Sequence, residues 1–165
     1  MLTLPEIVDR PAQPYAFITF TVRMDQMTEP ADKGFPALFA WLGQHGIEPV
    51  GAPFYNYRRI NMSKTLDVEA GIPIARLIAG EGQVETGTLP AGKFVTLDWI
   101  GHYDGLMGAT TMLIGWVRLT QVELDMTTQG EDDHFACRLE IYETDPSAEP
   151  DVEKWRTQLA FKIKN

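Results

Sequence analysis

One arrangement of elements occurs twice in the chain and restricts the folds that it can adopt. We expect the order strand, helix, strand, strand in Tyr15–Ile74 and again in Phe94–Lys164, an internal duplication of about 70 residues. Two such halves fit within 165 residues as one domain with a shared core. The duplication therefore predicts an α+β fold of two βαββ repeats, related by pseudo-two-fold symmetry, with a cleft between them.

The element boundaries follow from aromatic and β-branched runs, apolar helical stripes and breaks rich in Pro or Gly. In the first half we expect an extended lead-in over residues 1–14, a strand at Tyr15–Met24, a helix at Phe35–Gly46 and strands at Phe54–Arg59 and Leu66–Ile74. In the second half we expect a strand at Lys93–Tyr103, a helix at Asp104–Gln121, an acidic loop at Glu131–Asp133 and strands at Phe135–Thr144 and Lys154–Lys164. The single domain 1–165 then consists of repeat one at about 14–79, a linker at 80–92 and repeat two at about 93–165.

Each expected helix has one apolar stripe. In the first helix the stripe is Phe35, Leu38, Phe39 and Leu42, and Trp41 lies beside it. In the second helix the stripe is Leu106, Ala109, Leu113, Trp116 and Val117. Both helices should therefore pack on the sheet through these stripes.

The segment CRLEIYETDP, Cys137–Pro146, carries the most informative strand. Its apolar Cys137, Leu139 and Ile141 alternate with Arg138, Glu140 and Tyr142, so one face enters a core and the other carries a carboxylate. On this strand alone, a solvated face with an Arg–Glu pair is the simplest interpretation. The functional alternative makes Glu140 the central residue of a site.

Superposing the halves favours the functional alternative. Tyr55 then takes the place of Glu140, and Tyr57 takes that of Tyr142. The cleft would hold three phenols and one carboxylate, an arrangement that binds organic cations because ring faces attract positive charge and the carboxylate compensates it. Trp99 and Trp155 are further wall candidates, although both also fit core positions. Glu69 is a second candidate acid, with a solvated strand residue as its alternative.

Charge and composition exclude several classes of function. A net charge of −9 disfavours nucleic acid and favours a cationic partner. The three histidines and one cysteine lack metal-ligand spacing, and GEGQVETG lacks the strand–helix context of a phosphate loop, so neither a metal nor a cofactor is expected. The lone cysteine, the absence of a long apolar run and an N-terminus unlike a signal peptide predict a cytoplasmic protein.

Three stretches carry a resemblance to a known family: IVDRPAQPYAFITFTV, LPAGKFVTLDWIGHYDGLMGATTMLIGW and RLEIYETDPSAEP followed by RTQLAFKIK. The chain resembles the GyrI-like small-molecule-binding domain in stand-alone form, the effector-binding domain of AraC- and MerR-type multidrug regulators. The resemblance implies duplicated βαββ repeats of the SHS2 type around a ligand cleft. It also implies binding of hydrophobic, often cationic, compounds against a glutamate ringed by aromatic residues.

The resemblance assigns roles to particular residues. The family's E-x-Y-x-x-D-P pattern falls on Glu140, Tyr142, Asp145 and Pro146. Its first-repeat tyrosine falls on Tyr57, with Tyr55 as the alternative. The family's Gly-x-Tyr-x-Gly-like turn appears as Gly101–Gly105, with His102 and Asp104 as departures.

Two alternatives to binding or sequestration stay open. Some members resemble hydrolases that open cyclopropane-containing electrophiles, for which Glu140 with Tyr142 or Tyr57 could act as base and acid. The other alternative is a protein-interaction module, such as a gyrase inhibitor, with a shallow solvated cleft. The two repeats leave no room for a helix-turn-helix, so we expect no direct nucleic-acid or membrane partner, and a regulator or gyrase as possible protein partners.

Overall fold

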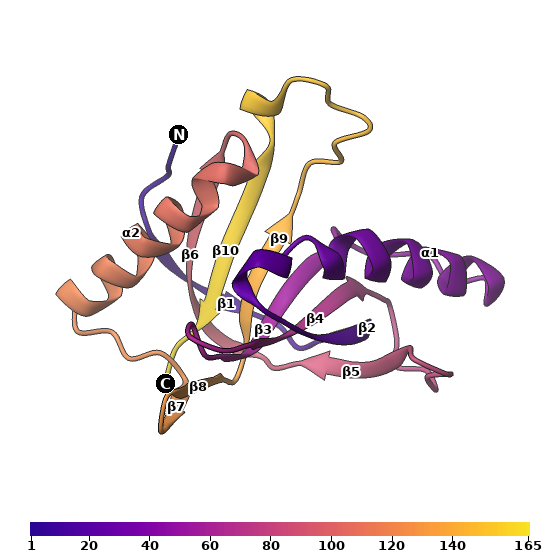
Figure 1. Ribbon diagram of the computed structural model, residues 1–165, viewed down its shortest axis with the longest axis horizontal. Helices are drawn as coiled ribbons and strands as arrows, with labels where there is room; N and C mark the ends of the chain where they lie inside the picture. The colour runs from indigo at the N-terminus through magenta and orange to yellow at the C-terminus, as the bar shows by residue number, and fades with distance from the viewer.

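The computed structural model describes residues 1–165 as a curled antiparallel sheet with two helices (Figure 1). The strands are β1 (Glu6–Arg10), β2 (Gln13–Val22), β3 (Phe54–Ile60), β4 (Leu66–Pro73), β5 (Glu85–Leu89), β6 (Gly92–Ile100), β7 (Met126–Gln129), β8 (Asp132–Phe135), β9 (Arg138–Tyr142) and β10 (Arg156–Lys162). The helices are α1 (Phe35–Gln44) and α2 (Leu106–Leu119). No helix is both long and apolar enough to cross a membrane.

The strand order is symmetric about the central pair β9–β3. From one edge to the other it runs β1-β6-β10-β9-β3-β4-β2-β5, and β7 and β8 form a hairpin beside β3. Moving outward from the centre, the first half contributes β3, β4 and β2, and the second half contributes β9, β10 and β6 in the same relative order. The expected order of strand, helix, strand, strand is present in both halves, interrupted in the second by the β7–β8 hairpin.

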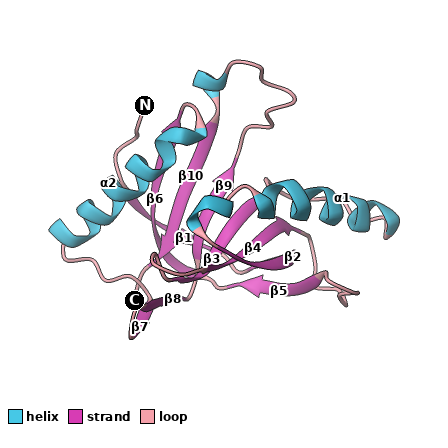
Figure 2. Ribbon diagram, viewed as in Figure 1, coloured by secondary structure: helices cyan, strands magenta, loops and turns pink.

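One row of paired residues crosses the whole sheet on the face that carries the helices. The pairing register connects Ile18, Ala70, Tyr55, Glu140, Leu159 and Leu97. Residues of α1 pack with Ile18 at one end of the row, and residues of α2 pack with Leu97 and Leu159 at the other. The helices stand over different halves of the sheet (Figure 2), so the centre of the row, at Tyr55 and Glu140, lies between them.

The helical stripes explain this packing, with one correction. Leu38 and Leu42 are buried as expected, but Phe39 is 46% exposed and Trp41, expected beside the stripe, is only 8% exposed. Trp41 follows Leu38 by one turn and so reaches the same cluster. In α2 the stripe is buried as expected, except that Trp116 is only partly buried.

The other face of the sheet has its own apolar cluster. It contains Tyr15, Phe54, Phe94 and Leu139, with Leu89 from β5, and Val8 from β1 packs against it. Strands at the two edges of the sheet thus contribute to one cluster, because the sheet curls toward this face. The curl buries apolar side chains that no helix covers.

Several expected boundaries differ from the structure. The lead-in contains β1, which pairs with β6, and the expected linker contains β5, which pairs with β2. The expected acidic loop at Glu131–Asp133 instead turns into β8 of a hairpin. The expected strand Phe135–Thr144 is divided into β8 and β9, because β3 has a bulge between Tyr57 and Arg59.

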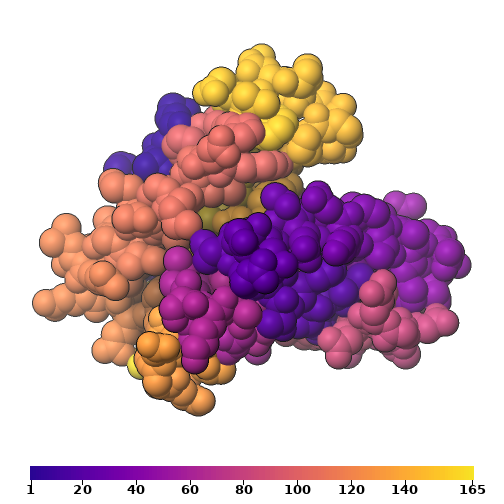
Figure 3. Space-filling view, viewed as in Figure 1, coloured from indigo at the N-terminus to yellow at the C-terminus, as the bar shows by residue number.

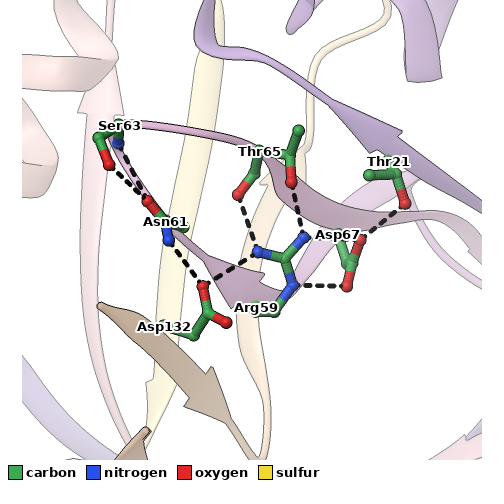
Figure 4. A network of polar contacts seen from close by, with 7 residues as sticks. All are labelled: Thr21, Arg59, Asn61, Ser63, Thr65, Asp67 and Asp132. Carbon is green, nitrogen blue, oxygen red and sulfur yellow. Dashed lines mark hydrogen bonds and ion pairs between the residues drawn. The ribbon is translucent and has the colours of Figure 1, made fainter. Parts of the chain in front are cut away.

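A polar network fixes the β8 end of this arrangement (Figure 4). Arg59 on β3 donates to both carboxylate oxygens of Asp67 on β4, and to Thr65. The same guanidinium donates to Asp132 on β8, which also accepts from Asn61. A planar guanidinium can make all these contacts at once, so the network ties the hairpin of the second half to the first half.

Candidate functional site

A cavity of about 1290 Å³ opens between the two helices and above the central strands. The space-filling view shows a hollow between α2 in salmon and the indigo-to-purple segment that leads into α1, with golden atoms of the C-terminal strands recessed at its base (Figure 3). Tyr55 and Tyr57 on β3 and Arg138, Glu140 and Tyr142 on β9 line it. A cavity of this size accommodates a drug-sized molecule.

Glu140 is the buried acid of this cavity, with 9% of its surface exposed. Its Oε1 accepts a hydrogen bond of 2.5 Å from the Tyr142 hydroxyl and one of 3.3 Å from the Tyr57 hydroxyl. No protein group donates to Oε2. Burial raises the pKa of Glu140 above its ordinary value, and the two phenol hydrogen bonds and the charge of Arg138 oppose that rise. The carboxylate therefore has one oxygen fixed by the protein and one available to a ligand.

The two phenols that hold Glu140 are themselves protonated donors. Burial, together with the negative charge of Glu140, holds the pKa values of Tyr57 and Tyr142 well above 10. Tyr142 lies edge-on to the rings of Tyr55, Tyr103 and Phe35, with centroid separations of 5.4, 5.6 and 6.1 Å. These rings line the same cavity as the carboxylate, and aromatic rings beside a carboxylate suit a cation.

Tyr55 faces the cavity but uses its hydroxyl elsewhere. The hydroxyl donates to the Met27 carbonyl and accepts from the Ala31 N–H, both at 2.8 Å. The segment so held includes a π-helical turn, Pro30–Gly34, and contributes Met27 and Ala31 to the cavity wall. Tyr55 therefore supplies a ring to the cavity and fixes one of its walls.

Arg138 does not form the pair with Glu140 that the simplest sequence interpretation expected. No carboxylate lies within 4.0 Å of its guanidinium, which instead packs against the rings of Phe161 and Phe135 at 4.5 and 4.7 Å. Burial lowers the pKa of Arg138, and the nearby Tyr57 and Glu140 oppose that shift. The face is thus neither solvated nor closed by an internal ion pair.

The remainder of the lining is acidic and apolar. The acidic residues are Asp32, Asp104, Asp133, Glu140, Glu143 and Asp145, whereas Arg138 is the only basic residue. Four methionines also line the cavity: Met24, Met27, Met62 and Met107. Their unbranched thioethers can adapt to ligands of different shape, and the excess of carboxylates favours positive charge.

Three of the residues expected at the site do not line the cavity. The Trp99 ring packs against Gly101 and Gly105, where a Cβ at Gly105 would lie 2.0 Å from its Cζ2. Trp155 lies behind Tyr103, at a ring separation of 4.8 Å. Glu69 is buried on the opposite face of the sheet, where it accepts from Tyr15 at 2.7 Å and Asn56 at 2.8 Å.

The structure also adds residues that the sequence reasoning did not assign to the site. Tyr103, in the Gly101–Gly105 turn, reaches the cavity, as do Phe35 and Phe39 from α1 and the methionines. The position of Tyr103 between two glycines was the one available signal. No group of three or more His, Cys, Asp or Glu side chains is arranged to hold a metal ion.

Comparison with protein families gives one match: the model of the GyrI-like small molecule binding domain covers residues 4–164. Comparison with curated proteins gives no significant match.

Comparison with solved structures gives the same fold in several proteins. The EcmrR C-terminal domain has a TM-score of 0.77 at 18% identity, with 98% of both chains covered. EcmrR in its DNA complex has a TM-score of 0.79 at 18% identity, and our chain, covered to 98%, spans 57% of its length. SAV2435 bound to tetraphenylphosphonium scores 0.61 at 10% identity, covering 99% of our chain and 95% of that one. A hydrolase from Listeria innocua scores 0.62 at 12% identity, covering 97% and 91%.

Proposed function

Because the chain belongs to the GyrI-like small-molecule-binding domain family, we propose that its central cavity binds hydrophobic, cationic small molecules. The observation that carries the proposal is the carboxylate of Glu140, which is buried among aromatic rings and leaves Oε2 without a protein donor. A cation placed there gains a charge-assisted contact and ring faces together. The acidic lining of the cavity also favours a positively charged ligand.

The proposed role is sensing or sequestration in the cytoplasm, in connection with transcription control. The fold shared with EcmrR, which has been seen in a DNA complex, supports the connection with transcription. The single cysteine is buried, and burial raises its pKa to about 12, consistent with an inert thiol in a reducing compartment.

The rival protein-interaction function, such as gyrase inhibition, predicted a shallow and solvated cleft. A cavity of about 1290 Å³ with a buried carboxylate supports a small molecule instead.

Hydrolysis is the second candidate function, supported by the raised pKa of Glu140 and the adjacent protonated phenols. In that case Glu140 would take a proton from water while Tyr142 or Tyr57 donated one to the group that opens. Binding and hydrolysis would use the same cavity. They are distinguished by whether the compound recovered from the protein is unchanged or hydrolysed.

The test is calorimetric titration with two ions of the same shape and opposite charge, tetraphenylphosphonium and tetraphenylborate. The phosphonium should bind saturably and the borate should not. Glu140→Gln should weaken phosphonium binding by about 1–3 kcal/mol, the size of a lost charge-assisted contact. Glu69→Gln is the matched control, because it neutralises a buried carboxylate on the other face of the sheet.

Equal phosphonium affinity in the parent and in Glu140→Gln would contradict the proposal. A second arm incubates the parent with a cyclopropane-containing electrophile and examines the recovered compound by mass spectrometry. Unchanged compound supports binding, whereas a water adduct that Glu140→Gln does not form supports hydrolysis.

A further inference from the structure

Arg138 is the one basic side chain in the cavity, and the proposed function gives it no role. It lies two residues before Glu140 on β9, so both side chains are on the helix-bearing face. Tyr57 lies between them: its ring centroid is 5.8 Å from the guanidinium carbon and its hydroxyl donates to Glu140. A positive and a negative group thus face the same cavity side by side.

The guanidinium has no polar partner in the protein. Its buried Nε lacks an acceptor, and its side chain takes part in none of the hydrogen bonds or ion pairs of the chain. The rings of Phe161 and Phe135 hold it by packing alone. Buried polar groups are nearly always hydrogen-bonded, and a guanidinium offers five N–H donors, so this one is placed to receive an acceptor from a ligand.

The balance of buried charge points to the class of that ligand. The negative charge of ionised Glu140 offsets part of the positive charge of Arg138, and Asp133 adds a smaller contribution. A simple cation on Glu140 cancels that contribution and leaves Arg138 with only the weaker influence of Asp133, in a medium where unpaired charge is costly. A ligand that carries a carboxylate beside its cation compensates both groups.

We propose that Arg138 forms an anion-binding subsite beside Glu140, so that the preferred ligands are hydrophobic zwitterions with a cationic group and a carboxylate. The inference rests on the proposed function, which it makes more specific. The cation contacts Glu140 and the surrounding rings, and the carboxylate receives the Arg138 guanidinium N–H groups. In the opposing interpretation Arg138 only packs between Phe135 and Phe161 and contacts no ligand.

Two dyes that share one cationic ring system test the subsite. Tetramethylrhodamine carries a carboxylate on its pendant ring, and tetramethylrosamine lacks it. Fluorescence anisotropy titration of the parent should give a dissociation constant roughly tenfold lower for tetramethylrhodamine, the effect of one charge-assisted contact.

Arg138→Met keeps an unbranched apolar stem between the two rings and removes the charge. It should abolish the preference for tetramethylrhodamine while leaving tetramethylrosamine binding unchanged or stronger. Arg76→Met is the matched control for net charge, because Arg76 is exposed in the segment after β4 and outside the cavity. It should retain the full preference.

The outcomes separate the subsite from the function on which it rests. If the parent binds both dyes equally, or binds tetramethylrosamine better, the subsite is wrong and the cation site stands. A preference that persists in Arg138→Met also overturns the subsite. If the parent binds neither dye saturably, both proposals fail. If Arg138→Met does not fold, the relative affinities of the two dyes for the parent protein still test the subsite.

Discussion

Tyr57 and Tyr142 donate hydrogen bonds to the same oxygen of Glu140, one from each half of the chain. The pairing of β3 with β9 centres on Tyr55 and Glu140, so Tyr57 and Tyr142 each lie two residues beyond that centre in their own strand. Equivalent positions in the two halves therefore converge on one carboxylate oxygen. The convergence leaves the second oxygen facing the cavity.

The first prediction concerns these two hydrogen bonds. Each phenol stabilises ionised Glu140, so replacing either with Phe should raise the pKa of Glu140 further and weaken cation binding near that pKa. The 2.5 Å bond of Tyr142 should matter more than the 3.3 Å bond of Tyr57. We expect the midpoint of the pH dependence of phosphonium affinity to move up by about one unit in Tyr142→Phe.

Tyr103→Phe is the control for loss of a cavity hydroxyl, because Tyr103 lines the cavity and makes no hydrogen bond to Glu140. It should leave the midpoint in place. An equal shift in Tyr103→Phe and Tyr142→Phe would show that the hydrogen bonds to Oε1 do not set the ionisation of Glu140.

The second prediction concerns pH itself. The folded protein binds the Glu140 proton more tightly than the unfolded chain does, because the pKa is raised. A bound cation favours the ionised form and so lowers the pKa of Glu140 in the complex. Phosphonium affinity should therefore rise with pH above the pKa of the complex and level off above the raised pKa of the free protein. The rise should reach at most tenfold per pH unit, and calorimetry across this range measures it.

The stability of the free protein should change in the opposite direction as pH approaches the raised pKa. The native state holds more protons there, so the free energy of unfolding falls as pH rises from the ordinary to the raised pKa. Glu140→Gln should remove all of the rise in affinity but only part of the fall in stability. The remaining fall in stability comes from Glu69, whose pKa is also raised by burial. An affinity rise preserved in Glu140→Gln would assign the titration to another group.

The third prediction concerns the wall that Tyr55 holds. Tyr55→Phe removes an acceptor from the Ala31 N–H and a donor from the Met27 carbonyl. The free energy of unfolding should fall by about 1–3 kcal/mol, measured by urea denaturation, because these groups lose their partner. Amide exchange at Ala31 should become faster. Tyr57→Phe is the control, because it keeps both hydrogen bonds of Tyr55. Equally fast amide exchange at Ala31 in Tyr57→Phe would show that the Tyr55 hydroxyl does not hold this wall.

The fourth prediction concerns the turn before α2. A Cβ at Gly105 would lie 2.0 Å from the Trp99 ring, so Gly105→Ala should displace the ring and cost about 1–3 kcal/mol of stability. Because Tyr103 belongs to this turn, phosphonium affinity should fall too. A Cβ at Gly108 would meet no atom within 4 Å beyond its neighbours along the helix, so Gly108→Ala should instead stabilise α2 by about 0.5–1 kcal/mol. Equal effects at both glycines would exclude the steric explanation.

Period-two alternation and the superposed halves predicted the faces of β9 and the register of the central strand pair. Alternation identified the faces of β9, and the equivalence of Tyr55 with Glu140 and of Tyr57 with Tyr142 agrees with the observed pairing register. Both signals are local, since each depends only on spacing along a strand. The family match bears out the resemblance that those residues carried.

Errors arose where a residue's surroundings depend on distant chain segments. Alternation gave the positions of Trp99 and Glu69 on their strands but not which neighbours cover each face. Glu69 lies on the face that the curl of the sheet buries. The ring of Trp99 packs against two glycines of the following turn, Gly101 and Gly105. Strands β1 and β5 were missed because edge pairing with β6 and β2, rather than their own sequences, makes them strands.

The register makes Tyr55 and Glu140 equivalent positions of the two halves, directly opposite each other. A dimer of identical halves would have to place the same residue at both positions. Two glutamates would repel each other, and two tyrosines would offer a cation no charge. Two halves in one chain are free of that constraint, because each half has its own sequence. It is the joining of the halves in one chain that permits a lone carboxylate at the pseudo-symmetry axis.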